Sequence, residues 1–208
     1  MITIYAATSN PGKLREFQRA APDFDVQALP AGIPPPDETG DTFEANAIQK
    51  ALAYSNHVNG FLFADDSGLS VDALNGAPGV HSARYAGTNF ANREENDAAN
   101  NALLLERLRG VTNRTARFVC VIALVKQGEW IKTFRGAVEG RIIEELRGSG
   151  GFGYDPLFYH DPFGCTFGEA LLEQKITVSH RAIALEQMFT YLRSSAASAG
   201  SQRLSSRP

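Results

Sequence analysis

Hydrophobic and polar residues follow two different periods along this chain, and together they predict an α/β fold. Short apolar, β-prone runs predict strands at residues 2–7, 24–29, 61–64, 69–74 and 157–159. Apolar residues at helical spacing predict helices that begin near Pro11, Asp41, Asn92 and Ser179. Strands that alternate with helices indicate one α/β unit with a mixed sheet.

Three segments define the organisation more closely. Residues 116–125 are the most strand-like of the chain, and a turn at 127–129 leads into a partner strand at 130–138, which predicts a β-hairpin. Residues 30–41 hold four prolines and two glycines and therefore predict a loop. The Ser- and Ala-rich residues 194–208 offer little to bury, so we expect a disordered tail after a single domain at 1–193.

Two of the predicted helices carry more detailed signals. Asp41 can cap the helix that it begins, and Glu44 at the third helical position completes an Asp variant of the capping box. The helix at residues 92–109 is polar over most of its length. We expect its inward face to carry Ala98, Ala102, Leu105 and Leu108.

The composition excludes several classes of protein. The 208 residues are 43% hydrophobic and 21% charged, which is ordinary for a globular protein. Twenty Lys and Arg against 23 Asp and Glu give a net charge of −3, so no global positive field exists to bind nucleic acid. The two cysteines, Cys120 in an apolar run and Cys165, are too few for a disulfide framework and indicate a reducing compartment. We see neither a secretory leader nor an apolar run long enough for a bilayer, and expect a cytoplasmic protein without a membrane partner.

The first candidate site lies where the first strand turns into the first helix. Hydroxyls, an amide, backbone N–H groups and an ammonium gather there in Thr8, Ser9, Asn10, Pro11, Gly12 and Lys13. A helix N-terminus and a lysine both favour phosphate, so this segment is a candidate anion cradle. It is not a Walker A sequence, and an N-capped turn beside a surface lysine is the alternative interpretation.

The second candidate site is acidic. Asp65, Asp66 and Ser67 follow an apolar strand, and neighbouring side chains on a strand point to opposite faces, so one carboxylate can point into a cleft. A carboxylate beside phosphate suggests Mg²⁺, which takes one or two protein carboxylates and completes its shell with water and phosphate oxygens. Glu38 and Glu44 are the candidate second ligands, although helix capping is the favoured role for Glu44.

The third and fourth candidate sites suit a base. Residues 148–153 satisfy G-x-G-x-x-G but do not open a helix, so the dinucleotide interpretation fails. Aromatics beside an acid suggest a stacking wall with a carboxylate for a ring N–H, although core aromatics in a tight turn are the alternative; these residues are Phe152, Gly153, Tyr154 and Asp155. Donors for a base carbonyl or for phosphate recur near the last helix, at Lys175, Ser179, His180 and Arg181. A surface position is the alternative for the His–Arg pair.

The order of these motifs is more specific than any one of them. The chain contains, in sequence, TSNPGK, DETG, ADDSGL, GAPGVHSARYAG, GGFGYDP and SHR. In this it resembles the noncanonical purine nucleoside triphosphate pyrophosphatases, the inosine triphosphatase or RdgB-like family, over residues 1–193. The resemblance implies a mixed α/β fold of two lobes with a central nucleotide-binding cleft, usually as a homodimer. It also implies Mg²⁺-dependent cleavage of inosine, deoxyinosine and xanthosine triphosphates to the monophosphate and pyrophosphate.

The resemblance also assigns roles to individual residues. It implies that the triphosphate is held by Thr8, Ser9, Asn10, Pro11, Gly12 and Lys13. It implies that Asp66 binds metal and activates water, that Ser67 touches the substrate and that Glu38 is a further metal ligand. It places the base pocket at Phe152, Gly153, Tyr154, Asp155, Lys175, His180 and Arg181. Ser9 stands where many members carry Gly, and Asp37 precedes Glu38 where some carry two glutamates.

Two other functions stay open at this point. A catalytically inert nucleotide sensor would use the same cleft, but Asp65 and Asp66 argue against it, because a pure binder of triphosphate gains little from extra negative charge. A pyrophosphatase for modified pyrimidine triphosphates is the second alternative, and a substrate panel decides between the bases. Trp130 and Phe134 are candidates either for a dimer surface or for the core.

Overall fold

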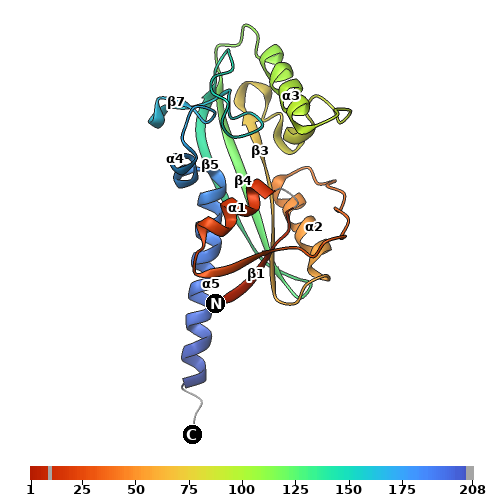
Figure 1. Ribbon diagram of the computed structural model, residues 1–208, viewed down its shortest axis with the longest axis vertical. Helices are drawn as coiled ribbons and strands as arrows, with labels where there is room; N and C mark the ends of the chain where they lie inside the picture. Colours follow the sequence, from red (N-terminus) through yellow and green to blue (C-terminus); the bar gives the residue numbers. More distant parts are fainter. Residues whose placement is uncertain (9–10, 205–208) are drawn as a thin grey trace.

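The computed structural model describes residues 1–8 and 11–204 of the chain (Figure 1). Its strands form one mixed sheet in the order β2-β1-β3-β4-β5-β6-β7. Their bounds are β1 Ile2–Ala6, β2 Phe24–Ala28, β3 Phe61–Val71, β4 Thr115–Lys126, β5 Glu129–Ile142, β6 Phe158–His160 and β7 Cys165–Thr166. β1 pairs in parallel with β2 and β3, whereas the later pairs are antiparallel. The predicted mixed α/β fold is confirmed.

The helices cover both faces of this sheet (Figure 1). Their bounds are α1 Pro11–Ala20, α2 Phe43–Ser55, α3 Arg93–Arg107, α4 Leu172–Val178 and α5 His180–Leu204. Short 3₁₀ helices follow β3 and β6: η1 Asp72–Leu74, η2 Gly79–Arg84 and η3 Asp161–Phe163. None of the described helices is long and apolar enough to cross a membrane.

Alternation along β3 and β4 divides the lower part of the molecule into two cores. Phe63 and Ile122 point to the side of α1 and α5, where they pack with Phe17 and Phe189. Leu62 and its neighbours on the other face pack under α2, at Ala47, Ala51, Ala64, Val121 and Val125. Because successive strand residues point to opposite faces, one apolar run supplies both cores. These two layers and their helices make up what we call the lower lobe.

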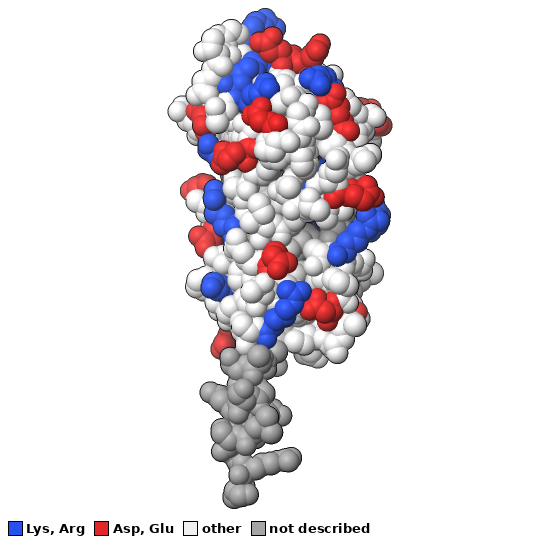
Figure 2. Space-filling model, turned by 90° about the vertical axis from the view of Figure 1, so that its left-hand side faces the viewer, with Lys and Arg blue, Asp and Glu red and all other residues white. Residues whose placement is uncertain are grey.

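A third core forms the upper lobe. It gathers Leu69, Leu104, Phe118, Phe158 and Phe167 under α3 and the short strands β6 and β7. The long strands β3, β4 and β5 run through both lobes, as Figure 1 shows. On the described face in Figure 2, acidic and basic side chains are interspersed, as expected from the net charge of −3.

The hairpin between β4 and β5 forms as predicted. A two-residue loop joins Lys126 to Glu129, and both of its residues, Gln127 and Gly128, have positive φ angles of 51° and 84°. Such loops match the right-handed twist of the strands they connect. On β5, Phe134 is buried in the core, whereas Trp130 is 51% exposed.

Helix α2 begins one residue later than predicted. Thr42, not Asp41, is the N-cap, because its hydroxyl accepts the Ala45 N–H at 3.1 Å from an extended backbone. Glu44 does not complete a capping box, since its carboxylate accepts the Thr133 hydroxyl of β5 at 2.5 Å. Contact with β5 therefore decides how Glu44 is used.

Helix α3 presents the predicted face only in its last turns, where Leu108 is buried and Leu105 packs against the upper core. Ala98 and Ala102 are exposed, whereas Asn100, Asn101 and Leu104 are buried. The prediction followed apolar residues, but the inward face is polar in its first half because the upper lobe offers hydrogen-bond partners there.

The C-terminal segment also differs from the expectation. Helix α5 continues to Leu204, so residues 194–204 of the expected disordered tail are helical, and 205–208 lie outside the described residues. The Ser194 and Ser195 hydroxyls bond the Tyr191 carbonyl. Each added residue extends an existing helix at little cost once a packed segment has nucleated it.

Candidate active site

The cleft lies between the two lobes and opens where β1 ends. β1 pairs with β3 only as far as Phe63, so the acids that follow on β3 pair with β4 alone. The sequence predicted an interruption by the acids at this point, but β3 runs through them to Val71. Beside this edge is a cavity of about 380 Å³, lined from both lobes by residues that include Thr8, Lys13, Glu38, Lys50, Asp65, Ser67, Ser82, Asp97, Phe152, Tyr154, His180 and Arg181.

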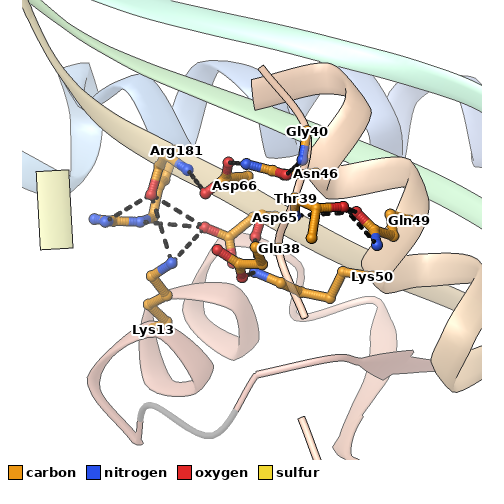
Figure 3. Close-up of polar contacts among 11 residues, drawn as sticks. Lys13, Glu38, Thr39, Gly40, Asn46, Gln49, Lys50, Asp65, Asp66 and Arg181 are labelled. Atoms are coloured by element: carbon orange, nitrogen blue, oxygen red, sulfur yellow. Dashed lines mark hydrogen bonds and ion pairs between the residues drawn. The ribbon is translucent and has the colours of Figure 1, made fainter. Parts of the chain in front are cut away.

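Asp65 lies on the cleft wall among cations (Figure 3). Its Oδ2 atom is 2.7 Å from Lys13 Nζ and 3.9 Å from Arg181 Nε, and it accepts the Ser67 hydroxyl at 3.3 Å. Burial alone would raise the pKa of Asp65, but the charges of Lys13, Arg181 and Lys50 outweigh burial and lower it to about 2. Asp65 is therefore an anion that holds cations in place.

Asp66 points to the opposite side of β3, toward α2 (Figure 3). One carboxylate oxygen accepts the Asn46 side-chain N–H at 3.0 Å, and the other accepts the Ser67 backbone N–H at 2.9 Å. Burial, with 7% of the residue exposed, raises the pKa of Asp66 above its ordinary value despite the Asn46 hydrogen bond. Of the two adjacent acids, Asp66 is thus the more basic.

Lys50 is a cleft residue that sequence reasoning missed. Its ammonium forms an ion pair with Glu38 and donates to the Asp65 carbonyl oxygen at 3.1 Å. Burial alone would lower the pKa of Lys50, but Asp65 and Glu38 raise it. A signal exists in the sequence, because Asn46 and Lys50 are four residues apart beside the alanine stripe of α2.

The acidic donors suit a hard cation. Among the described residues, no three His, Cys, Asp or Glu side chains gather to hold a metal ion. Mg²⁺ needs only one or two carboxylates, and Glu38 on the cleft wall with the nearby Asp66 meets that requirement. The Lys50 ammonium bound to Glu38 shows that this position attracts a cation. Glu44 is not among the residues that line the cleft, and its carboxylate accepts the Thr133 hydroxyl of β5.

The base end of the cleft is built around Phe152. The centroid of its ring is 5.1 Å from Lys175 Nζ and 5.1 Å from the Arg181 guanidinium carbon. Asp155 is buried and accepts both Lys175 Nζ at 2.5 Å and the Phe152 N–H at 2.8 Å, so it fixes the loop that carries the ring. Tyr154 lines the cleft but also belongs to the upper core, and its hydroxyl donates to the Ser82 carbonyl at 2.8 Å.

His180 is buried at the start of α5 with its ring available to a ligand. It is 3% exposed, and its ring stacks on Phe118 at 5.0 Å. Neither ring nitrogen has a hydrogen-bond partner among the described residues. Burial, reinforced by the charges of Arg181 and Lys175, lowers its pKa well below the ordinary value, so the imidazole is neutral. The predicted Ser179 cap is present, because its hydroxyl accepts the Ala182 N–H at 3.2 Å.

Comparison with known proteins places this architecture in a family. The Ham1 family model matches residues 4–191. The chain belongs to the Ham1 family. A dITP/XTP pyrophosphatase of Exiguobacterium is 48% identical over 186 residues, covering 88% of this chain and 92% of the relative. One of Bacillus subtilis is 46% identical over 188 residues, with the same two coverages.

Solved structures of Ham1 proteins share the fold. The Staphylococcus aureus protein superimposes with a TM-score of 0.82 at 41% identity, covering 93% of this chain and 99% of that one. The Coxiella burnetii protein gives a TM-score of 0.83 at 40% identity, covering 93% and 100%.

In this Ham1-family protein, most of the predicted site residues converge on the cleft from distant segments, but Asp66 is not among the residues that line it. Thr8 and Lys13, which flank the start of α1, both line the cleft. Ser9 and Asn10 lie outside the described residues, and of Pro11 and Gly12 only the helical backbone is described. Lys175 lies behind the wall on Asp155, whereas Gly153 and Arg181 line the cleft itself.

Proposed function

We propose that this protein hydrolyses noncanonical purine nucleoside triphosphates, namely inosine, deoxyinosine and xanthosine triphosphate, to the monophosphate and pyrophosphate. The observation that carries the proposal is the neutral, buried His180 at one end of the cleft, whose two ring nitrogens have no partner in the described part of the chain, while the other end presents Lys13. The relatives named dITP/XTP pyrophosphatase, 44–48% identical over most of the chain, support it.

The end of the cleft at Lys13, the phosphate end, is suited to bind the negatively charged triphosphate. Lys13 and the N-terminus of α1 favour a polyanion, and the flanking Thr8 adds a hydroxyl. Asp65 holds Lys13 before the substrate arrives, so the ammonium is ordered in advance. In this proposal the triphosphate lies along Thr8 to Lys13, including Ser9 and Asn10, and Ser67 contacts it from β3.

The base end selects a keto-purine. His180 or Arg181 donates to the oxygen at position six of hypoxanthine or xanthine, whereas adenine presents an amino donor to Arg181 there. A buried donor left without a partner costs about 1–3 kcal/mol, so adenosine triphosphate is disfavoured. Guanine also has an oxygen at position six, so its exclusion depends on the amino group at position two.

Asp66 is the proposed general base. The Asn46 side chain fixes its carboxylate by a hydrogen bond, so Asp66 is held in one orientation to accept a proton. Water beside Asp66 loses its proton to the carboxylate as its oxygen attacks the α-phosphorus, and the bond to the pyrophosphate oxygen breaks in line. Lys13 stabilises the charge on the departing pyrophosphate.

We also propose that Mg²⁺ is the cofactor, held by Glu38 and Asp66. When bound, Mg²⁺ neutralises phosphate charge and lowers the pKa of a coordinated water. Lys50 balances the negative charge of Glu38 and orders its carboxylate. Asn46 does the same for Asp66 through a neutral hydrogen bond.

The test is a substrate panel with identified products. Pyrophosphate release is measured from inosine, deoxyinosine, xanthosine, adenosine and guanosine triphosphates, with Mg²⁺ and with chelator, and in ¹⁸O-water. We expect metal-dependent release from the first three and ¹⁸O in the monophosphate. Binding of inosine triphosphate without release of pyrophosphate would favour the sensor. Release of pyrophosphate only from modified pyrimidine nucleoside triphosphates, measured in the same way, would favour the pyrimidine enzyme.

The assembly and compartment follow from other features. We propose a homodimer in the cytoplasm, supported by the family resemblance, by the exposed Trp130 and by two cysteines that form no disulfide. Light scattering coupled to gel filtration tests the dimer: a mass of one chain at micromolar concentration would contradict it.

A further inference from the structure

The inward face of α3 is polar along its first half. Asn100 and Asn101 are buried, and Asn96 and Asp97 line the cleft. These residues lie one helical turn apart in pairs, so they form one stripe along the helix. Buried amides and carboxylates destabilise a fold unless hydrogen bonds satisfy them, so the partners of this stripe explain why it is polar.

Two side chains of the stripe hold one residue of the base-end loop. Asp97 Oδ2 accepts the Gly153 N–H at 2.8 Å, and Asn101 Nδ2 donates to the Gly153 carbonyl at 2.9 Å. Gly153 has a φ of +63°, a conformation that glycine adopts easily. Since Phe152 directly precedes Gly153, α3 sets the position of the aromatic wall.

The same helix also covers the ring itself. The Arg93 guanidinium carbon is 4.5 Å from the centroid of Phe152, and Arg93 Nε is 3.7 Å from Asp97 Oδ2. A cation over an aromatic face is attracted by the ring's quadrupole. One turn of α3 therefore links Arg93, which lies over the Phe152 ring, to Asp97, which binds Gly153.

The opposite wall is tied to α3 as well. Asn96 donates to the Ala83 carbonyl at 2.8 Å, and Asn100 accepts the Ala86 N–H at 2.8 Å. Ala83 belongs to η2 and lines the cleft. The stripe thus fixes two segments on either side of the base end, which are separated by about 70 residues of sequence.

We propose that Asp97 is a positioning residue for the purine base, which acts by fixing Phe152 and Gly153 through the Gly153 N–H, with Asn101 holding the carbonyl of the same residue. The inference rests on the proposed function, because it assumes that the base stacks at Phe152. Asp97 contributes nothing to the phosphate end, which is formed by α1, β3 and the loop that carries Glu38.

The test compares Asp97→Ala with Asp97→Asn and with Glu94→Ala, an exposed acid of the same helix. We expect Asp97→Ala to raise the KM for inosine triphosphate about 10- to 100-fold with kcat changed less than about threefold, because a hydrogen bond to a charged acceptor is lost. Asp97→Asn keeps an acceptor oxygen and restores KM to within about fivefold of the wild type. Glu94→Ala leaves KM unchanged.

Two further measurements separate positioning from damage to the cleft. Inorganic tripolyphosphate, tested as a competitive inhibitor, has no base, so its Ki stays within about twofold in Asp97→Ala. An unchanged KM in Asp97→Ala, or a Ki that rises in parallel with KM, would overturn the inference. If the wild type turns over no purine triphosphate, the proposed function fails by itself. In that case the Kd for inosine monophosphate, measured by calorimetry, tests the role of Asp97. It should rise in Asp97→Ala, stay near the wild-type value in Asp97→Asn and be unchanged in Glu94→Ala.

Discussion

The two ends of the cleft differ in the interactions that they offer to a substrate. At the phosphate end, Lys13 forms an ion pair with Asp65, and Lys50 forms one with Glu38 (Figure 3). At the base end, Phe152 and the neutral His180 face the cleft. Arg181 reaches both ends, since it lies over Phe152 and bonds Ser67.

This contrast shows how one site can combine a common reaction with a narrow choice of substrate. Charges act on any triphosphate, because every nucleotide carries the same phosphates. Neutral donors and acceptors act on the edge of the base, where hypoxanthine and adenine differ, and desolvation makes a mismatch costly. The division predicts that substitutions at the phosphate end change rate for all bases and that substitutions at the base end change selectivity.

The largest effect is expected at Asp66. We expect Asp66→Asn to lower kcat for inosine triphosphate by about 10²- to 10⁴-fold, because amide nitrogen and oxygen cannot take a proton from water. Steady-state pyrophosphate release in Mg²⁺ measures this loss. The matched control is Asp72→Asn, which removes a carboxylate at the surface beside Arg117. Near-normal turnover of Asp66→Asn would remove Asp66 from the mechanism.

A smaller effect, confined to selectivity, is expected at His180. Phenylalanine keeps the stacking on Phe118 but offers no hydrogen bond, so we expect His180→Phe to reduce the preference for inosine over adenosine triphosphate by about 10- to 100-fold. The ratio of kcat/KM values for the two substrates measures it. A preference that survives intact would assign the discrimination to Arg181 alone.

The smallest effect concerns stability against pH. The folded state holds the pKa of His180 below its unfolded value of about 6.5, so the unfolded chain binds more protons at acidic pH. This stability is present above pH 6.5 and is lost as the pH falls toward the folded pKa, by at most about 1.4 kcal/mol per pH unit. Urea unfolding at pH 7.5, 6 and 5 should show a steeper loss in the wild type than in His180→Phe. Parallel losses would mean that folding leaves the pKa of His180 at its unfolded value.

Much of the fold could be predicted from the sequence because the patterns that determine it are local. The β4–β5 hairpin depends on two apolar runs and the turn at Gln127 and Gly128, all within a few residues. The two cores on either side of β3 follow from alternation within one strand. Helix α4 was missed because it is only seven residues long and carries little periodicity.

The site was predictable where a motif carries its own chemistry. Lys13, Asp66 and Arg181 each stand in a short distinctive segment, although their roles remain predictions. Lys50 was missed because its partner Glu38 lies in a proline-rich loop outside the helix. The first half of the inward face of α3 was predicted wrongly because its partner Gly153 is more than 50 residues away, and helical periodicity cannot reveal a polar contact at that range.

The most direct test of the division between the two ends compares Lys13→Ala with His180→Phe on inosine and adenosine triphosphates. The account predicts that Lys13→Ala lowers kcat/KM for both substrates by the same factor, about 100-fold, and leaves their ratio unchanged. It predicts that His180→Phe lowers kcat/KM for inosine triphosphate and collapses the ratio. A changed ratio in Lys13→Ala, together with an unchanged ratio in His180→Phe, would contradict the account.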